Sequence, residues 1–457
     1  MPDILGLLAG IAERLPSVSK PAPKPTLYRR LMFTGLVLVL YFIMASIPLY
    51  GIPRQATGGA QMELLRIIFA SSAGTLMELG IGPIVTAGLI LQILVGAKII
   101  DLDLTQPEAR RKFTGAQKTL SILFAFLQAT AFVVGKRYWA GTGVEPSLAI
   151  MIVVILQLVF GAYMVILFDE MLQKGWGIGS AVSLFILAGV AQSVFWSFLG
   201  VIPGVIESYG LIPALIEERS AILLARPNAY PDVTGALATV TMVVVLAYLQ
   251  SMRVEIPVTS PRFRGIRSRV PLQFIYVTNI PILLVGILVA DLQLVEGILR
   301  DFLGPNHSFY QAYSTALYYI SPPRGIIDAA SDPLRTITFA ISWIIMAVIF
   351  GLLWVEIAGL NPREQAERLV KSGLEIPGVR RNPKAVESML GQYIYPLTVL
   401  SSLIVAVIVI VADIFGAYGT GTGLLLAVGI INQYYAIIVR ERALEAYPLL
   451  KRILGEE

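Results

Sequence analysis

The sequence predicts an all-α integral membrane protein in which ten transmembrane helices form two pseudo-symmetric, inverted halves of five. Of the 457 residues, 56% are hydrophobic and only 14% are charged, whereas soluble domains carry about 25% charged residues. The mean hydropathy is +0.75. Ten uncharged runs of roughly membrane-spanning length follow one another along the chain, and the basic residues gather in alternate connections between them.

Each of the ten runs is close to or beyond the roughly 20 residues that an apolar helix needs to cross a bilayer. Their centres contain no Asp, Glu, Lys or Arg, which argues against ion coupling and intramembrane catalysis. Only Asp413 and the turn Gly416–Gly423 separate the last two runs, which predicts a tight hairpin. The predicted spans are Leu31–Pro53, Leu79–Ala97, Thr119–Gly135, Pro146–Phe168, Gly175–Ile206, Val233–Met252, Val270–Ala290, Thr336–Val355, Gln392–Ala412 and Ile414–Val439.

The distribution of basic residues predicts the orientation. An even number of spans places both termini on one side of the membrane. With the N-terminus in the cytoplasm, most of the 35 lysines and arginines fall in cytoplasmic segments, as the positive-inside rule requires. We therefore expect a multi-pass protein of the cell membrane with both termini in the cytoplasm.

The organisation along the chain follows from these spans. Ile4–Ala12 predicts an amphipathic helix on the membrane surface, and a proline-rich linker over 17–26 follows it. The run has no basic flank, so we do not expect it to be a cleavable signal peptide. The predicted units are the N-terminal segment 1–30, an N-terminal half 31–206, an external hinge loop 207–232, a C-terminal half 233–440 and a cytoplasmic tail 441–457.

Groups for ordinary catalysis or metal binding are missing from the sequence. There is no cysteine, so disulfides and thiolate sites are excluded. The single histidine, His307, lies in a polar loop. The glycine-rich stretch Gly419–Gly423 lacks the lysine of a phosphate-binding loop, and no hydrolase or metalloprotease motif is present. We expect a protein that is not an enzyme and uses no cofactor or metal.

Two cytoplasmic loops, 253–269 and 359–391, are rich in arginine. Basic loops of this kind can simply hold themselves on the cytoplasmic side. Arginine also makes forked contacts with phosphate, so an anionic partner such as RNA is an equally good interpretation.

Two helix-disturbing prolines suggest internal symmetry. Pro83 lies in the second span of the first half and Pro281 in the second span of the second half, and we expect both near the outer part of their spans. An odd number of spans in each half makes the repeats inverted, which points to a functional site where the halves meet.

Six motifs in order resemble the SecY family, the main subunit of the Sec protein-translocation channel, in its archaeal and eukaryotic form. The resemblance runs from about Leu27 to Leu450. The motifs are Leu79-Gly-Ile-Gly-Pro-Ile-Val-Thr-Ala-Gly88, Asp169-Glu170, Gly175-Trp-Gly-Ile-Gly-Ser180, Met252-Arg-Val-Glu-Ile-Pro257, Tyr276-Val-Thr-Asn-Ile-Pro281 and Gly421-Thr-Gly-Leu-Leu-Leu426.

The resemblance implies a clamshell of two halves around an hourglass pore. At its waist an apolar ring would exclude water and ions by dewetting and close around a passing polypeptide. The matching positions are Ile81, Val85, Ile178, Val182, Leu283 and Leu426. The segment of about 60–73 would be a plug that fills the outer funnel, through Gln61, Met62, Leu65, Ile68, Phe69 and Ser72.

The resemblance also implies a lateral gate to lipid between spans two and seven. Thr86, Gln128, Asn279 and Pro281 are its expected residues, and hydrogen bonds of about 0.6 kcal/mol between membrane helices would hold it shut until a signal sequence arrives. We expect Asn279→Leu to change how hydrophobic a signal must be, and an unchanged threshold would contradict this.

The partners implied by the resemblance are the ribosome, signal sequences and nascent polypeptides, membrane lipid, a SecE-like (gamma) subunit and a beta-type subunit. The expected ribosome-docking residues are Arg262, Arg264, Arg267, Arg380 and Arg381. From the residues alone, a secondary transporter with inverted repeats and an insertase or scaffold without a continuous pore stay open as alternatives.

Overall fold

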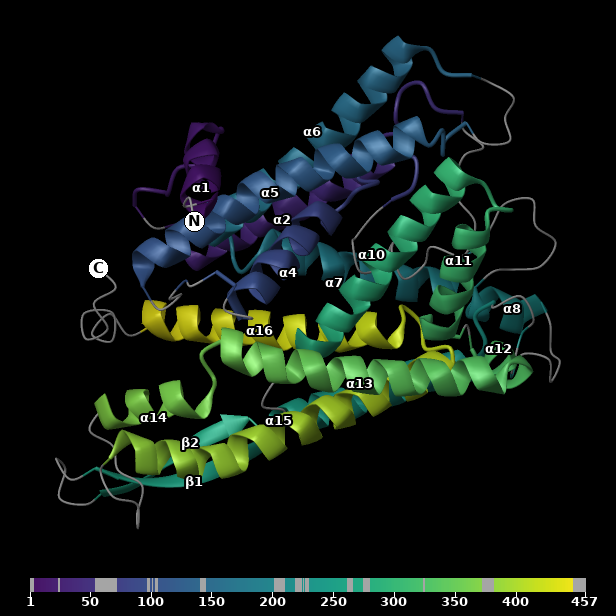
Figure 1. Ribbon diagram of the computed structural model, residues 1–457. Helices are drawn as coiled ribbons and strands as arrows, with labels where there is room; N and C mark the ends of the chain where they lie inside the picture. Colours follow the sequence, from purple (N-terminus) through teal and green to yellow (C-terminus); the bar gives the residue numbers. More distant parts are fainter. Residues whose placement is uncertain are drawn as a thin grey trace.

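The structure of the chain is a computed structural model that is almost entirely helical (Figure 1). It describes residues 4–23, 25–53, 72–96, 99–100, 102, 106–139, 145–200, 210–217, 224, 226, 230–260, 266–273, 280–323, 325–371 and 382–446.

Within these residues nine helices are long and apolar enough to cross a membrane, and α4 is a shorter apolar helix. This pattern agrees with the predicted class and is consistent with ten spans. The nine long helices are α2 (Leu27–Ser46), α5 (Pro107–Val134), α6 (Leu148–Gln173), α7 (Ala181–Leu199), α9 (Val233–Ser251), α10 (Ile280–Leu303), α13 (Pro333–Ile357), α15 (Pro383–Ile414) and α16 (Gly421–Ala446), and the shorter helix α4 is Gly82–Gly96.

Local sequence explains where these helices begin. A proline occupies the first turn of α5, α13 and α15, where its missing N–H costs no intrahelical hydrogen bond. The side chains of Ser147, Asp232 and Asn382 accept hydrogen bonds from the first backbone N–H groups of α6, α9 and α15, which satisfies otherwise unpaired donors. The predicted hairpin of the last two spans is confirmed, since α15 ends at Ile414 and α16 begins at Gly421.

The predicted seventh span, Val270–Ala290, is wrong at both ends. Residues 270–273 belong to the antiparallel hairpin of β1 (Arg253–Ser260) and β2 (Ile266–Gln273). The membrane helix is α10, which begins at Ile280 and continues through Asp291 to Leu303. The uncharged run crossed this boundary because β-strand residues and membrane-helix residues are both apolar, so hydropathy alone does not separate them.

Short elements gather at the two ends of the bundle (Figure 1). At one end lie α1 (Ile4–Arg14), α14 (Pro362–Lys371) and the β1–β2 hairpin, near the start of α2 and the end of α16. At the other end lie α8 (Leu211–Glu217), α11 (Ser308–Ile320) and α12 (Ile326–Ser331). An ion pair of 2.7 Å between Arg30 and Glu441 places the start of α2 beside the end of α16. We call the end that carries α1, α14 and the β1–β2 hairpin the terminal end, and the end that carries α8, α11 and α12 the opposite end.

The helix α1 packs onto the spans. Leu5 and Ala12 are buried, and Leu5 packs in a cluster with Leu91 of α4 and Ala116 of α5. Leu7 and Ile11 remain exposed on the other face. The predicted helix is therefore present. One of its apolar faces packs against α4 and α5, and the other face is exposed.

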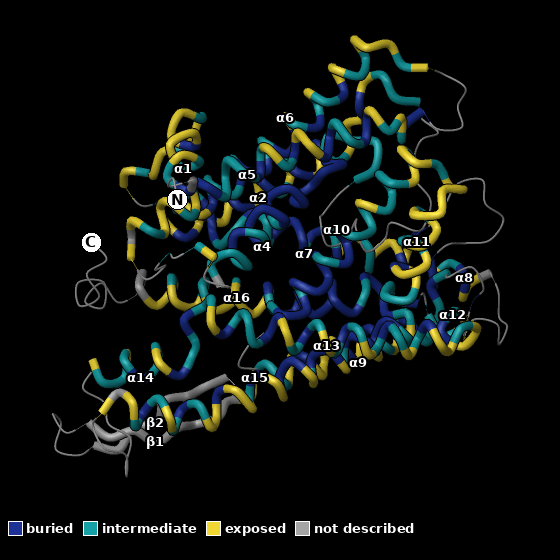
Figure 2. The backbone as a smooth tube through the Cα atoms, in the orientation of Figure 1, coloured by how far each residue is buried: buried dark blue, intermediate teal, exposed yellow. Residues whose placement is uncertain are grey.

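The largest apolar core lies in the middle of the bundle, where α4, α7, α10, α13, α15 and α16 meet (Figure 2). Towards the outside, α13 exposes a stripe of apolar side chains at every fourth position. A helix with one buried and one exposed apolar face is typical of packing against neighbouring helices on one side and lipid on the other. The stripe consists of Ile337, Ile341, Ile345 and Ile349.

Candidate pore and lateral gate

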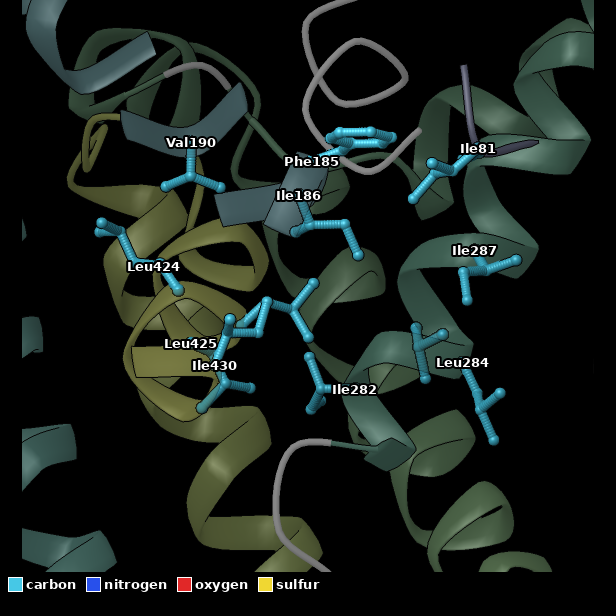
Figure 3. Close-up of a cluster of buried hydrophobic side chains, with 14 of the residues drawn as sticks. Ile81, Phe185, Ile186, Val190, Ile282, Leu284, Ile287, Leu424, Leu425 and Ile430 are labelled. Carbon is cyan, nitrogen blue, oxygen red and sulfur yellow. The ribbon is translucent and has the colours of Figure 1, made fainter. Parts of the chain in front are cut away.

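Five of the six predicted ring residues belong to one apolar cluster. Ile81 and Leu426 are buried within it, and Val85, Val182 and Leu283 are partly buried against it. These residues come from α4 and the turn before it, α7, α10 and α16, so both halves contribute. Figure 3 shows Ile186 of α7, Ile282 of α10 and Leu425 of α16 pointing into the space between their helices. All six predicted ring positions carry aliphatic side chains without a hydrogen-bonding group, as an apolar constriction requires.

Ile178 takes a different position. It is fully buried, but it lies in the turn before α7 and is not among the members of the central cluster. Its backbone N–H donates to Thr34 Oγ1 at 2.9 Å, so α2 holds this turn in place.

A polar contact joins the two halves between α4 and α10. Thr86 Oγ1 donates to the carboxylate of Asp291, at 2.9 Å to one oxygen and 3.2 Å to the other. Thr86 is 8% exposed. We call the line of contact between α4 and α10 the seam. It is the place where the predicted lateral gate would open, and Thr86 is a predicted gate residue that the structure places on it.

Asp291 is a functional candidate that the sequence reasoning missed. The expectation that span centres carry no charge is wrong here, because α10 continues for twelve residues beyond Asp291. Asp291 directly follows the uncharged run Val270–Ala290, so that a span defined by uncharged residues ends just before it. One signal could have found it: counted from Pro281, a helix of about 20 residues must include Asp291.

Of the other three predicted gate residues, the structure describes two, Gln128 and Pro281. Gln128 is buried on α5, next to α4 in the bundle. Pro281 is the second residue of α10, and Pro83 the second of α4. Pro281 therefore lies in the first turn of α10, at the end of the helix that follows the β1–β2 hairpin in the chain, and the place of the two prolines near the outer part of their spans stays a prediction. Asn279 lies outside the described residues.

The two ends of the predicted plug segment are joined to each other. Pro48 and Thr75 form an antiparallel bridge, and Leu49 N–H donates to the Gly74 carbonyl at 2.9 Å. On the same side, Leu76 N–H donates to the Ile47 carbonyl at 3.1 Å. We call Ile47–Pro53 together with Ser72–Glu78 the mount. Of the predicted plug residues Ser72 lies in it, and Gln61, Met62, Leu65, Ile68 and Phe69 lie outside the described residues.

The mount is fixed to the N-terminal half. Gln157 of α6 exchanges two hydrogen bonds with Tyr50, accepting from its N–H at 2.9 Å and donating to its carbonyl at 3.2 Å. Gly161, one turn further along α6, lies so close to Leu76 that a Cβ there would stand 2.0 Å from the Leu76 carbonyl oxygen. The chain therefore leaves and re-enters the helical bundle at one defined place.

Of the two arginine-rich loops, the structure describes residues 253–260 and 266–269 of the first and residues 359–371 and 382–391 of the second. Arg262, Arg264, Arg380 and Arg381 lie outside the described residues. Arg267 is on β2, where its backbone is paired with Thr259. The hairpin and α14 lie at the same end of the molecule (Figure 1).

Comparison with known proteins decides the family. Residues 75–435 match the family model described as SecY, and residues 39–74 match the model of the plug domain of Sec61p. The chain belongs to the SecY family. The SecY protein translocase subunit of Aeropyrum pernix is 67% identical over 454 residues, covering 99% of each chain.

Two solved structures support the same assignment. A structure of a protein-conducting channel has a TM-score of 0.79 and 37% identity, covering 95% of this SecY-family chain and 97% of the other. Sec61 in the canine ribosome–channel complex from the endoplasmic reticulum has a TM-score of 0.76 and 36% identity, with the same coverage. The resemblance inferred from the six motifs is therefore confirmed, and so is the predicted helical membrane fold, apart from the β1–β2 hairpin.

Proposed function

We propose that this chain is the pore subunit of a protein-conducting channel, which moves unfolded secretory polypeptides across the membrane and releases transmembrane segments sideways into lipid. The observation that carries the proposal is the central apolar cluster, to which α4, α7, α10 and α16 contribute from both halves. A charged or hydrogen-bonding filter would retain particular side chains, whereas an apolar ring lets any sequence pass and still excludes ions.

The lateral gate is assigned to the seam. The Thr86–Asp291 contact is the polar link across it, and Gln128 and Pro281 lie on the helices that border it. A signal sequence would enter between α4 and α10 and break the Thr86–Asp291 hydrogen bond. Its own apolar side chains would then pack against the two helices, and it would move on into lipid. Passage through the ring is driven by partners, and we propose no catalysis by the chain itself.

The partners follow from the relatives. Because a relative of 36% identity is seen in a ribosome–channel complex, we propose that the hairpin loop 253–269 and the loop 359–391 dock the ribosome, with both termini in the cytoplasm. A SecE-like and a beta-type subunit would complete the assembly. The division into halves 31–206 and 233–440, joined by an external hinge loop 207–232, is part of the same proposal.

The proposal is tested by ion conductance. We expect the complex of this chain with its small subunits to be silent in a planar bilayer, and a deletion of Gln61–Ser72 to open flickering channels because the ring alone seals poorly without the plug. Translocation of a polar reporter polypeptide by the same vesicles separates a channel from an insertase. Silence of the deletion variant together with failure to move the reporter would contradict the channel function.

The docking proposal gives a second prediction. The double variant Arg264→Glu with Arg380→Glu should bind ribosomes much more weakly, because two phosphate contacts become repulsive. The affinity of the unaltered complex should fall with added salt, with a log–log slope that becomes shallower in the variant. Co-sedimentation at several salt concentrations measures both. Lys136→Glu at the opposite end of the molecule is the matched control, and equal affinity of all three proteins would refute the assignment.

A further inference from the structure

We infer that the terminal end of the molecule carries a site that binds an extended polypeptide by its backbone carbonyl groups, and that the linker 16–19 of this chain is its occupant. We call this the carbonyl site; its donors are Lys118, Tyr163, Lys174 and Trp176. Through it the N-terminal segment holds the turn that leads into α7. The binding is independent of the proposed function, whereas the expected effect on the resting pore rests on it.

Side-chain donors from separate elements meet the carbonyl oxygens of the linker. Lys118 Nζ of α5 and the Tyr163 hydroxyl of α6 both donate to the Pro16 carbonyl, at 3.0 and 2.9 Å. Trp176 Nε1, in the turn before α7, donates to the Ser19 carbonyl at 2.8 Å. Four residues of the linker therefore tie α5, α6 and this turn together.

The two lysines of the carbonyl site share one carboxylate. Glu170 pairs with Lys118 at 3.0 Å and with Lys174 at 2.5 Å, and Lys174 also donates to the Val18 carbonyl. The side chains of Lys118 and Glu170 are only 12% and 18% exposed. One carboxylate and two ammonium groups leave an excess of positive charge and of donors. The carbonyl oxygens of an extended backbone complement both, which gives the Asp169-Glu170 motif a role.

The side chains of the linker leave this binding to its backbone. Pro16, Ser17, Ser19 and Lys20 are exposed, and the linker belongs to neither helix nor strand, so its carbonyl groups need partners from elsewhere. Prolines, which favour an extended backbone, are frequent over 16–25. A site that contacts only carbonyl oxygens accepts any sequence that stays extended.

The helix α1 brings the linker to the carbonyl site. Ala9 crosses α5 at Gly115, where a Cβ would stand 3.1 Å from the Ala9 Cα, so this close crossing suits glycine. Thr119 Oγ1 donates to the Leu8 carbonyl at 2.8 Å, one more backbone carbonyl bound by a side chain of α5. Because α1 is fixed on α5, the linker stays near the site at a high effective concentration.

Through Trp176 the linker reaches the apolar ring. The Trp176 ring makes an edge contact of 5.4 Å with Phe33 of α2, so the start of the turn lies between the linker and α2. Val182, six residues further on, packs against the central cluster as a predicted ring residue. We therefore expect loss of the linker to loosen the start of α7 and with it the seal of the ring.

The test uses the full chain in complex with its small subunits. A protease recognition sequence is inserted between Pro21 and Ala22, outside the carbonyl site, and the complex is cleaved in detergent. The measured quantity is the rate at which the N-terminal fragment is lost on washing. Detergent replaces the bilayer, so retention of the fragment reports contact with the protein and not with lipid.

Tyr163→Phe combined with Trp176→Phe should release the fragment at least tenfold faster, because two donors are lost while both aromatic rings stay. Ser17→Ala, Val18→Ala and Ser19→Ala together should leave the rate unchanged, since every carbonyl group remains. Unchanged release from the first variant, or equally fast release from the second, would overturn the carbonyl site.

Two glycine variants test the docking of α1 separately. Gly115→Leu should release the fragment by pushing α1 away from α5. Gly10→Leu is the matched control, because a Cβ at position 10 would meet nothing within 4 Å, and it should retain the fragment. Equal release from both would show that α1 does not hold the linker at the site.

Resting conductance of the cleaved, washed and reconstituted complex measures the effect on the ring. We expect an ion leak once the fragment is lost, and sealing when a synthetic peptide of residues 1–20 is added back. Silence of the washed complex, beside a conducting variant that lacks Gln61–Ser72, would overturn the role of the linker in holding the turn. Silence of both would instead contradict the channel function, and the release rates would still decide the carbonyl site.

Discussion

Replacing Thr86 with valine should make the channel accept less hydrophobic signal sequences, whereas replacing Asp291 with leucine should make it reject signals that it now accepts. The two residues share one hydrogen bond, so a simple loss of that bond predicts the same direction for both. The opposite signs follow from what each substitution leaves behind in the closed seam.

Valine at position 86 leaves the Asp291 carboxylate without its hydroxyl partner. Interhelical hydrogen bonds in membranes are worth about 0.6 kcal/mol on average, and an unpaired carboxylate adds a further desolvation cost. A loss of roughly 1–2 kcal/mol from the closed state shifts the gate towards opening about tenfold. Leucine at position 291 instead removes the buried carboxyl group together with its desolvation cost, and the Thr86 hydroxyl that remains can donate to a backbone carbonyl one turn back in its own helix.

The measurement is translocation of a reporter behind a graded series of signals that differ only in the number of leucines. Glu296 supplies a matched control. It lies on α10 as Asp291 does, but it accepts its hydrogen bond of 2.6 Å from Ser314 of α11, within the C-terminal half. Glu296→Leu and Ser314→Ala should leave the threshold in place. A shift of the threshold in the same direction for Thr86→Val and Asp291→Leu would contradict the argument.

The sequence predicted the fold class well because hydropathy reports directly on the lipid environment. Among the described residues, nine long apolar helices and the shorter α4 are consistent with the ten predicted runs. The predicted span boundaries were wrong where contacts with other segments of the chain, and not hydropathy, determine where a helix begins or ends. Residues 270–273 are as apolar as a span, but they pair with β1, and the helix that follows includes Asp291 because a hydroxyl from the other half meets its carboxylate. Neither partner is visible from local sequence.

The candidate site was predictable to a similar degree. The ring positions came from a family resemblance, and five of the six lie in the central cluster. The ion pair between Arg30 and Glu441 joins residues more than four hundred positions apart, and no local spacing predicts such a contact. The motif Gly175–Ser180 is visible in the sequence, but its hydrogen bonds with Thr34, Asp169 and Tyr434 are set by the fold and not by local spacing.

Gly161→Ala should produce a channel that leaks ions at rest, because the new methyl group would point at the Leu76 carbonyl from 2.0 Å away. A backbone atom cannot rotate aside as a side chain can, so the mount or α6 must move. Overpacking of this kind costs about 1–3 kcal/mol. The displacement falls on the segment that follows the plug, whose residues Ser72 and Met77 are joined by a hydrogen bond of 3.0 Å.

Planar-bilayer conductance without substrate measures the leak. Gly35→Ala is the matched control, since a Cβ at position 35 of α2 would meet nothing within 4 Å, and it should remain silent. Gln157→Leu, which removes both hydrogen bonds to Tyr50, should leak through the same mount without any steric clash.

The combination with the plug deletion separates a displaced plug from a damaged helix. If Gly161→Ala acts through the mount, it should add little to the conductance of a variant that already lacks Gln61–Ser72, because two changes that act through one element are not additive. If it acts by distorting α6 and the bundle behind the ring, the two leaks should add. Additive conductance would therefore show that the mount does not hold the plug in place.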